Sequence, residues 1–416
     1  MVKKIHFMGV GGSGMAGVAY LAKKLGYEVT GCDLEMGGHD IKHLNNIDLL
    51  VVTPAVFYQS ARHPELLEGK KRGIVISWQE FLGKYLQKGK KVIAIAGTHG
   101  KSTTTAMVGK LLEDARFDPL VNLGANYKKW SGGARYGKGN YFVTEADEFF
   151  DNFLNYHPEI IILNNIEFDH PDYFKSEKQI FESFTKFVGK LRGEKLLIVN
   201  NDSPGVQKLL KDIDTSSLKV IKYSLKNHNL KLNLKVLGKH NIANALGVVA
   251  LAKYLKIKDE VIKKSLESFA GIGRRMELIS GKGGIKVYDD YAHHPTAIKA
   301  TIEAIRGKYP HNRLWVVVEP HGYARTHALL RNYQGVFERA DKVIIGPIFK
   351  ARDNETFGII PKSVVEISGH LDILTANSLG QIVEIIKKDV RKGDIILVMG
   401  AGKSNLWAKE ICNLKI

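Results

Sequence analysis

Residues 97–104 read Gly97-Thr98-His99-Gly100-Lys101-Ser102-Thr103-Thr104, and they stand between the apolar run Val92–Ala96 and a helical segment. This is a shortened P-loop, which keeps the Gly-Lys-Ser core although Ile95 occupies the position of the usual first glycine. In such a turn the backbone N–H groups bind nucleotide phosphates, the lysine neutralises the transferred phosphate and the serine ligates Mg²⁺. The stretch predicts a strand–turn–helix unit in an α/β nucleotide-binding domain.

Acidic and imidazole groups follow the next two apolar strands of this region. Glu145–Glu148 come after the run Tyr141–Thr144, and Glu167–His170 come after Ile160–Asn164. The carboxyl ends of parallel strands open onto one crevice, so Glu145 and His170 could hold Mg²⁺ together with Ser102. On spacing alone an ordinary turn remains the alternative. Asp147, Glu148 and Asp169 are expected to act through other residues or to lie at the surface.

A second glycine turn lies near the start of the chain. Gly9, Gly11 and Gly14 satisfy G-x-G-x-x-G after the apolar run Lys4–Val10, and Asp33 ends the next predicted strand. Such glycines let the backbone approach a diphosphate, the following helix supplies N–H donors, and the acid accepts from a hydroxyl. Taken alone, the turn predicts NAD binding, or a tight turn without a ligand.

The chain of 416 residues is too long for one core and predicts several domains. Strands and amphipathic helices alternate along it, which is typical of parallel sheets covered by helices on both faces. We expect an α/β protein of three domains, with Rossmann-like domains at 1–88 and 274–416 and a mostly parallel P-loop domain at 89–273. The basic segment before residue 91 and the glycine-rich Gly271–Arg275 mark the two boundaries.

Composition is that of a globular protein, with 61 Lys and Arg against 43 Asp and Glu and a net charge of +18. The lysines are scattered along the chain in pairs without a nucleic-acid-binding motif, so we expect solvated surface charge and no nucleic-acid partner. No long apolar stretch or signal sequence is present, so we expect a cytoplasmic protein without membrane insertion. Cys32 and Cys412 fit neither a disulfide framework nor a metal-ligand spacing.

Further polar clusters stand in turns after strands or at helix starts, where ligands are often bound, although each alone is more typical of a capped turn. They are Gly238–Ala245, Arg274-Arg275, Asp289–Thr296 and Glu319–Thr326. The segment Gly400-Ala401-Gly402-Lys403-Ser404 imitates a P-loop, but only one residue separates its glycines. We interpret it as a strand-end turn, with substrate contact left open.

In their order along the chain, these motifs resemble the Mur ligases over essentially the whole sequence. The matching landmarks are Gly9–Gly17, Gly97–Thr104, Glu145–Glu148, Asp169-His170, His240-Asn241, Asn244-Ala245, Arg274-Arg275 and Asp289–Thr296. The resemblance implies three domains, an N-terminal one for a UDP-sugar, a central ATPase and a C-terminal one for the incoming amino acid. It also implies an acyl phosphate intermediate, ATP with Mg²⁺ or Mn²⁺, and closure of the domains to exclude water.

The resemblance also assigns roles by position. The catalytic residues would be Lys101, Glu145, His170 and Arg275, and the metal ligands Ser102, Glu145 and His170. ATP would contact Gly97, Thr98, His99, Gly100, Lys101, Ser102, Thr103, Asn241, Asn244, Arg275, Asp290 and His294. The UDP-sugar would contact Gly11, Gly12, Ser13, Gly14, Met15 and Asp33, and the acceptor amino acid His321, Tyr323 and Arg325.

The acceptor is less narrowly defined than the sugar, which the resemblance implies is UDP-N-acetylmuramate. The pattern His321–Thr326 is similar to that of members adding L-alanine, which we favour, whereas Asn164–His170 and Thr296–Ile298 look more like members adding a ready-made tripeptide. Ala297 stands where alanine-adding members more often carry Glu.

Three other functions explain the motifs less completely. An NAD-dependent oxidoreductase leaves the P-loop unexplained, and a motor-type ATPase leaves the first glycine turn unexplained. An RNA-binding module explains only the net charge.

Overall fold

The computed structural model describes residues 2–59, 61–227, 231–280 and 282–414. The chain forms two compact units, each assembled from separate segments. One comprises Met1–Glu167, Glu177–Asn233 and Ala243–Phe269, and the other comprises Phe168–Ser176, Leu234–Ile242 and Ala270–Ile416. The short segments 168–176 and 234–242 therefore belong with the C-terminal part of the chain, so the predicted boundary at 273/274 stays a proposal.

The first unit begins with a four-stranded parallel sheet. Its order is β2 (Glu28–Cys32), β1 (Lys4–Met8), β3 (Leu49–Val52) and β4 (Val75–Ser77). The connecting helices are α1 (Ser13–Lys24), η1 (Ile41–Leu44), α2 (Pro54–Gln59), α3 (Pro64–Lys71), α4 (Trp78–Phe81) and the π-helical turn η2 (Leu82–Leu86). Short strands joined by helices force the parallel arrangement, because each crossover returns the chain to the same end of the sheet.

A seven-stranded sheet forms the rest of this unit. Its order is β11 (Lys219–Tyr223), β10 (Leu196–Asn200), β9 (Ile160–Leu163), β5 (Lys91–Ala96), β8 (Tyr141–Ala146), β6 (Leu120–Asn122) and β7 (Ala134–Arg135). All neighbouring strands are parallel except the pair β6 and β7 at one edge. The helical elements are α5 (Lys101–Asp114), η3 (Phe149–Asn155), α6 (Glu177–Val188), α7 (Pro204–Asp212), α8 (Lys239–Tyr254) and α9 (Asp259–Glu267).

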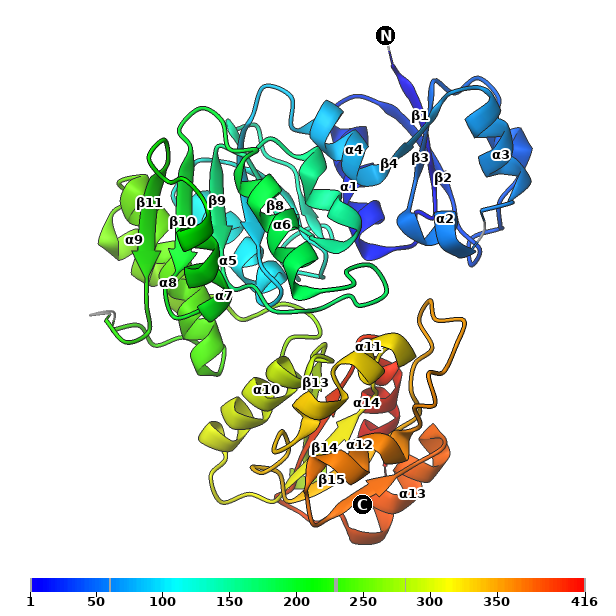
Figure 1. Ribbon diagram of the computed structural model, residues 1–416, viewed down its shortest axis with the longest axis vertical. Helices are drawn as coiled ribbons and strands as arrows, with labels where there is room; N and C mark the ends of the chain where they lie inside the picture. The colour runs from blue at the N-terminus through cyan, green and yellow to red at the C-terminus, as the bar shows by residue number, and fades with distance from the viewer. Residues whose placement is uncertain (1, 60, 228–230, 281, 415–416) are drawn as a thin grey trace. The chain divides into compact units, whose positions relative to one another are not determined.

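Figure 1 shows α6 and α7 on one face of this sheet and α5 and α9 on the other. The three central strands are β9, β5 and β8. Their inner residues are buried and apolar except in β8, where Thr144 is buried and polar and Glu145 is partly buried. Strands covered on both faces carry continuous apolar runs, which is the pattern of Val92–Ala96 and Ile160–Leu163. The carboxyl ends of these strands carry Gly97–Gly100, Glu145–Glu148 and Asn164–Glu167, so the sheet brings the predicted nucleotide motifs to one edge.

The second unit is built on a six-stranded sheet. Its order is β12 (Glu277–Ser280), β13 (Lys286–Asp290), β17 (Ile395–Met399), β14 (Leu314–Val318), β15 (Lys342–Ile345) and β16 (Ile373–Thr375), with only β12 antiparallel. Its helices are α10 (Pro295–Lys308), α11 (Tyr323–Ala328), α12 (Pro361–Ser368), α13 (Leu379–Asp389) and α14 (Ser404–Cys412), with 3₁₀ turns η4 (Lys282–Gly284) and η5 (Leu330–Tyr333).

The residues of β14 alternate between two cores in this unit. Leu314, Val316 and Val318 pack in a cluster with side chains of α10 and α12. Trp315 and Val317 pack in a second cluster with side chains of α13 and α14. Because successive side chains of a strand point to opposite faces, this alternation shows that helices cover both faces of the sheet.

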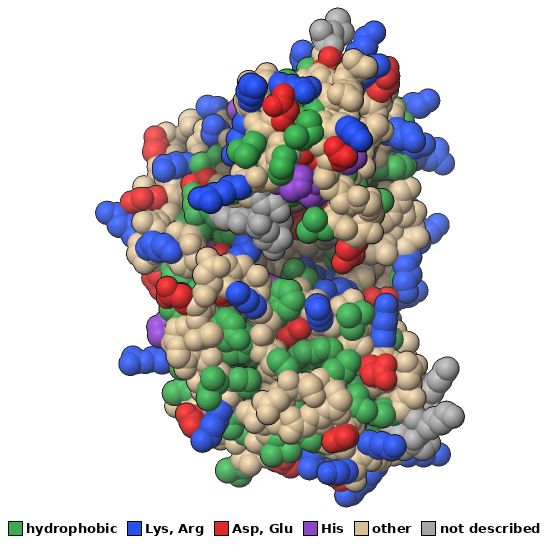
Figure 2. Space-filling model, turned by 90° about the vertical axis from the view of Figure 1, so that its right-hand side faces the viewer, with side chains coloured by type: hydrophobic (Ala, Val, Ile, Leu, Met, Phe, Trp, Pro, Cys, Tyr) green, Lys and Arg blue, Asp and Glu red, His purple; other side chains and the backbone are tan. Residues whose placement is uncertain are grey.

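The surface carries its basic side chains without a single concentrated patch on the face seen in Figure 2, where Lys and Arg are interspersed with Asp and Glu. Among the described residues, no helix has the length and apolar character that crossing a membrane requires.

Candidate active site

The turn between β5 and α5 has the backbone conformation that only glycine adopts without strain. Gly97 has φ 129° and Gly100 has φ 81°. A Cβ atom on Gly100 would lie 2.5 Å from Asn244 Oδ1 and 2.9 Å from Asn164 Nδ2. The loop is therefore packed closely against two asparagine side chains, one of which, Asn244, is also predicted to contact ATP.

Lys101 begins α5 and is paired with a buried acid. Its Nζ donates to Gly97 O at 2.7 Å and forms an ion pair with Glu148 Oε2 at 2.8 Å. Burial raises the pKa of Glu148 to about 7, although the charge of Lys101 opposes this. Burial lowers the pKa of Lys101, but the charges of Glu148 and Asp147 outweigh it and hold that pKa above its usual value. Glu148 is therefore not a surface group, and its pairing with Lys101 agrees with the other expectation for it, an action through another residue.

Ser102 and Glu145 meet beside Lys101. The Ser102 hydroxyl donates to Glu145 Oε2 at 3.0 Å, and Glu145 Oε1 accepts from the backbone N–H of Gly124 at 2.6 Å. A hydroxyl and a carboxylate are hard oxygen ligands of the kind Mg²⁺ prefers. This donor set fits a divalent cation next to the phosphates of a nucleotide. The third predicted ligand, His170, belongs to the other unit.

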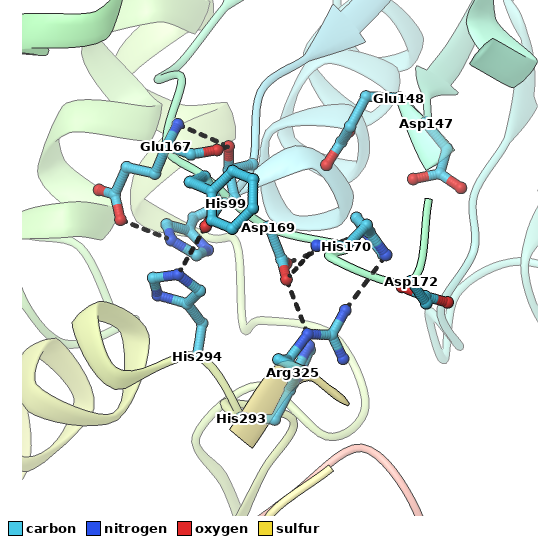
Figure 3. A network of polar contacts seen from close by, with 12 residues as sticks. His99, Asp147, Glu148, Glu167, Asp169, His170, Asp172, His293, His294 and Arg325 are labelled. Atoms are coloured by element: carbon cyan, nitrogen blue, oxygen red, sulfur yellow. Dashed lines mark hydrogen bonds and ion pairs between the residues drawn. The ribbon is translucent and has the colours of Figure 1, made fainter. Parts of the chain in front are cut away.

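The residues after β9 hold the P-loop from its other side. Asn165 Oδ1 accepts from the backbone N–H of His99 at 2.8 Å, and Thr98 Oγ1 accepts from the N–H of Glu167 at 2.9 Å. His99 Nε2 lies 3.3 Å from Glu167 Oε2, a contact drawn in Figure 3. Asn164 and Asn165 were not identified as site residues from sequence. Their position at the end of a buried strand, next to the strand that leads into the P-loop, is a signal that could have found them.

In the second unit, Arg325 of α11 holds the segment 168–176. Its Nε donates to Asp169 Oδ1 at 2.7 Å, and its Nη2 lies 3.2 Å from His170 Nδ1, as the dashed lines in Figure 3 show. Burial alone would raise the pKa of Asp169, but the charge of Arg325 holds it well below its usual value. Arg352 adds an ion pair with Asp172 at 3.3 Å. Asp169 is therefore a buried ion-pair partner, and His170 is oriented by the same arginine.

Two further residues predicted to bind the acceptor, His321 and Tyr323, lie close to Arg325 along the chain. His321 is half-buried, and its ring stacks on Phe349 with centroids 5.2 Å apart. Among the described residues, its Nδ1 has no hydrogen-bond partner. Burial lowers the pKa of His321 to about 3, with the charges of Arg325 and Arg352 adding to the effect. Tyr323 begins α11, and a small cavity is lined by His321, Gly322, Arg325, Arg352 and Asp353.

The remaining predicted nucleotide residues of the second unit have clear structural partners. Asp290 accepts from the backbone N–H groups of Met276 and Ala292, each at 2.7 Å. The His294 side chain caps α10 by accepting from Thr296 N, and Arg275 lies over the Tyr291 ring at 4.6 Å. Asn241 donates to Leu237 O at 2.7 Å. These contacts fix the side chains in place without excluding a ligand.

The N-terminal glycine turn follows β1 as predicted. Gly9 has φ 90°, and a Cβ there would lie 2.3 Å from Thr53 Cγ2, so the close approach requires glycine. Asp33 Oδ2 accepts from the backbone N–H of Gly11 at 3.0 Å. Gly14 faces Trp78, Met15 is buried and Gly12 is exposed. Ser13 begins α1, and its side chain lies outside the described part of the chain.

The loop Gly400–Ser404, which imitates a P-loop, is occupied by a side chain of the protein. Glu319 accepts from the backbone N–H groups of Gly402 and Ser404 through Oε2, and of Lys403 through Oε1, at 3.0 to 3.1 Å. Arg274 donates to Gly400 O at 2.8 Å and Ser404 Oγ at 3.0 Å. The N–H groups that a phosphate would need are already bound, so the structure agrees with a strand-end turn.

The sequence matches three family profiles in succession. They are described as "Mur ligase family, catalytic domain" over residues 4–90, "Mur ligase middle domain" over 95–252 and "Mur ligase, glutamate ligase domain" over 274–402.

Two relatives with long alignments are UDP-N-acetylmuramate–L-alanine ligases. That of Clostridium acetobutylicum is 37% identical over 442 residues, covering 96% of this chain and 95% of the relative. That of Aquifex aeolicus is 33% identical over 450 residues, covering 98% of this chain and 97% of the relative.

Two solved structures share the fold over nearly the whole chain. UDP-N-acetylmuramate–alanine ligase from Thermotoga maritima matches with a TM-score of 0.79 at 23% identity, over 99% of this chain and 98% of the other. A murein peptide ligase from Psychrobacter arcticus matches with a TM-score of 0.71 at 26% identity, over 100% of both chains.

Proposed function

The chain belongs to the Mur ligase family, and from this premise we propose that it joins the carboxylate of UDP-N-acetylmuramate to the amine of L-alanine at the expense of ATP. The relatives with that activity span nearly the full length of the chain. The observation that carries the proposal is the P-loop, in which Lys101 begins α5 beside Ser102 and Glu145. The reaction belongs to the synthesis of peptidoglycan precursors.

The chemistry requires a leaving group, because a carboxylate does not react with an amine in water at useful rates. One carboxylate oxygen attacks the γ-phosphorus of ATP, the bond to ADP breaks, and an acyl phosphate forms. Lys101 lies where it can neutralise the charge gathered on the transferred phosphate, and Glu148 holds its Nζ toward the loop. The amine then attacks the acyl carbon, phosphate leaves, and the nitrogen gives up a proton.

The divalent cation is part of this proposal. Ser102, Glu145 and His170 are the residues we assign to hold Mg²⁺, for which Mn²⁺ could substitute, and the first two already share a hydrogen bond. A bound cation supplies charge neutralisation for the nucleotide phosphates. Glu145 is in turn fixed by Gly124 N–H, so one of its oxygens keeps a defined direction.

The substrates are assigned to separate parts of the chain. Gly11, Gly12, Ser13, Gly14, Met15 and Asp33 in residues 1–88 would bind the UDP-sugar. The P-loop in 89–273 would bind the ATP phosphates, with Asn241, Asn244, Arg275, Asp290 and His294 contributing to the nucleotide site. Because the reaction consumes ATP and a UDP-sugar, we place it in the cytoplasm.

The acceptor site is assigned to 274–416, at His321, Tyr323 and Arg325. The Nδ1 of His321 is buried and without a partner among the described residues, and the low pKa keeps the ring neutral. A neutral imidazole can accept a hydrogen bond from the amine of the acceptor. Arg325 is a cation near this ring, although Asp169 already pairs with it.

The test measures phosphate release from ATP and Mg²⁺ with UDP-N-acetylmuramate and one acceptor at a time. The acceptors are L-alanine, glycine, L-serine and the tripeptide L-Ala-γ-D-Glu-diaminopimelate, with the product mass determined for each. We expect release coupled to an alanyl product. Turnover with the tripeptide alone would move the assignment to tripeptide addition, and no sugar-dependent turnover with any acceptor would reject the ligase proposal.

A variant pair makes this assay specific for the P-loop. Lys101→Met should reduce phosphate release by at least about a hundredfold, because it removes the cation that neutralises the transferred phosphate. Lys129→Met replaces an exposed lysine outside the site and should leave turnover unchanged. Equal activities of the two variants would contradict the role of Lys101.

A further inference from the structure

A cluster of buried polar side chains lies on one face of the N-terminal sheet, away from the P-loop residues. Its members are His6 of β1, Cys32 of β2, His43 of η1 and Glu65 of α3. The side chains of His6 and Glu65 are 3% and 0% exposed, Cys32 is 2% exposed and His43 is 33% exposed.

The sheet itself brings these groups together. His6 and Met8 lie on one face of β1, and the parallel register pairs them with Thr30 and Cys32 of β2. Met8 and Cys32 belong to an apolar cluster with Leu44 of η1 and Leu66 of α3. The neighbours of these two leucines, His43 and Glu65, therefore sit at the edge of a dry core.

The distances between the polar atoms are those expected around a single ion. His6 Nε2 lies 3.2 Å from Cys32 Sγ and 3.3 Å from Glu65 Oε1. Glu65 Oε1 lies 3.5 Å from His43 Nδ1 and 3.8 Å from Cys32 Sγ. Donor atoms bonded at about 2.0–2.3 Å to one tetrahedral metal ion lie roughly 3.3–3.8 Å from one another.

We propose that His6 Nε2, Cys32 Sγ, His43 Nδ1 and Glu65 bind a divalent transition-metal ion, with zinc as the ion that this ligand set suits best. Two imidazoles, a thiolate and a carboxylate are all zinc ligands, and four of them complete a closed tetrahedral site of the structural kind. The inference stands on the N-terminal sheet alone and is independent of the ligase reaction. The partly exposed His43 gives an ion its path from solvent.

Neighbouring side chains orient these ligands as the outer partners of metal sites do. His6 Nδ1 lies 2.7 Å from Thr30 Oγ1, which leaves Nε2 directed at the cluster. His39 Nδ1 lies 2.9 Å from Cys32 Sγ and can donate to a thiolate. His63 Nδ1 accepts from the backbone N–H of Glu65, caps α3 and lies outside the cluster. His43 Nδ1 also accepts from a backbone N–H, that of Asp40 at 3.2 Å, and it would exchange this bond for the ion.

A metal ion also resolves an electrostatic conflict in this core. Glu65 and the Cys32 thiol are both buried, with 3.7 Å between Oε2 and Sγ. In the absence of a cation, the Cys32 thiol keeps its proton and donates it to the Glu65 carboxylate. A divalent ion would stabilise thiolate and carboxylate together, with release of that proton. The alternative is a metal-free network of hydrogen bonds among the same groups.

No local pattern along the chain indicates this site, because its ligands come from four separate elements and share no short spacing. Cys32 has no metal-ligand spacing along the chain, and the other proposed ligands come close to it only in the folded structure. Cys412 lies at the end of α14 and supplies a natural comparison.

The test uses the full-length chain, freed of metal with a chelator and titrated with Co²⁺ as a spectroscopic probe and then with Zn²⁺. We expect about one cobalt ion per chain, with a thiolate-to-cobalt charge-transfer band and the intense visible bands of tetrahedral cobalt, all displaced by zinc. Zinc should also raise the melting temperature of the metal-free protein. Failure of the metal-free chain to bind cobalt with this band would leave the hydrogen-bonded network as the correct description.

Two variants and two controls locate the ion. Cys32→Ser should lose the charge-transfer band, and His43→Gln, at a partly exposed position, should weaken cobalt binding at least about tenfold while the circular dichroism stays unchanged. Cys412→Ser and His63→Asn should bind cobalt as the unaltered chain does, since neither removes a ligand and Asn can still cap α3. A charge-transfer band that persists in Cys32→Ser or disappears in Cys412→Ser would overturn the assignment.

Discussion

His321 shows how burial sets the chemistry of one side chain. The ring is enclosed, its Nδ1 lacks a partner among the described residues, and the nearby charges of Arg325 and Arg352 disfavour a proton. Its pKa falls to about 3, so the imidazole is neutral throughout the physiological range. A residue of this kind can accept a hydrogen bond from an amine without first losing a proton of its own, but it is too weak a base to take the proton of the amine.

This neutrality predicts a pH dependence of stability. The unfolded chain binds a proton at His321 near pH 6.5, whereas the folded chain does not until about pH 3. The stabilising contribution is therefore complete above pH 6.5 and is lost as the pH falls, by up to about 1.4 kcal/mol per pH unit. We expect the melting temperature to fall more between pH 7 and pH 5 in the unaltered chain than in His321→Gln.

NMR of the same sample provides the control. The imidazole signals of His321 should keep their neutral positions at pH 5, while those of exposed histidines titrate. A fully protonated His321 at pH 5, together with equal losses of melting temperature in both proteins, would show that burial does not govern this ring.

Some residues of the candidate site could be predicted from the sequence, and others could not. The P-loop residues were predictable because glycine, lysine and serine at fixed spacing are required by a turn that binds phosphate. Glu148 contacts Lys101, which lies 47 positions earlier in the chain, and Asn165 contacts His99, which lies 66 positions earlier. No local sequence pattern indicates such pairs. The same holds for Cys32 and Glu65, whose separation in sequence is 33 residues.

At the scale of elements, apolar runs located most of the strands. The apolar run Val92–Ala96 begins one residue after β5 and ends with it, and Ile160–Asn164 is one residue longer than β9. The short antiparallel strands β7 and β12 were not predicted, because edge strands half exposed to solvent have no continuous apolar run. The fold class, with mostly parallel sheets, is confirmed.

The turn between β17 and α14 yields a prediction of its own. Glu319→Gln replaces one acceptor oxygen by an amide group whose hydrogens face the N–H groups of residues 402–404. The change should destabilise the second unit by about 1–3 kcal/mol, since buried donors lose their acceptor. Amide hydrogen exchange at Gly402, Lys403 and Ser404 measures the effect directly. The exposed Glu338→Gln is the matched control, and identical exchange in both variants would contradict the capping role.

For the whole molecule, the membership of segment 168–176 in the second unit is the feature that composition and periodicity did not predict. The segment is held there by Arg325 on Asp169 and by Arg352 on Asp172. It is covalently continuous with Asn165 and Glu167, which contact the P-loop in the first unit. The chain passes between the two units more than once, and the predicted boundary at 273/274 stays a proposal.

Removal of one arginine tests this division. Arg325→Ala leaves Asp169 buried without its cation, which should lower the free energy of local opening by about 3–5 kcal/mol. Hydrogen exchange should accelerate in residues 168–176 and in α11 and remain unchanged in β5, β8 and β9. Arg339→Ala, at an exposed position, should alter neither region. Accelerated exchange throughout the seven-stranded sheet would show that the segment belongs to the first unit instead.

The occupied loop at Gly400–Ser404 has a consequence for inhibitor design. Glu319 is a competitor built into the chain, and a tethered competitor acts at an effective concentration that a freely diffusing anion does not match. A phosphate mimic directed at glycine-rich turns would therefore bind at Gly97–Thr104 and not at Gly400–Ser404, where Glu319 already occupies the N–H groups. The selectivity between these two similar loops is determined by the side chain of Glu319, which binds one of them and not the other.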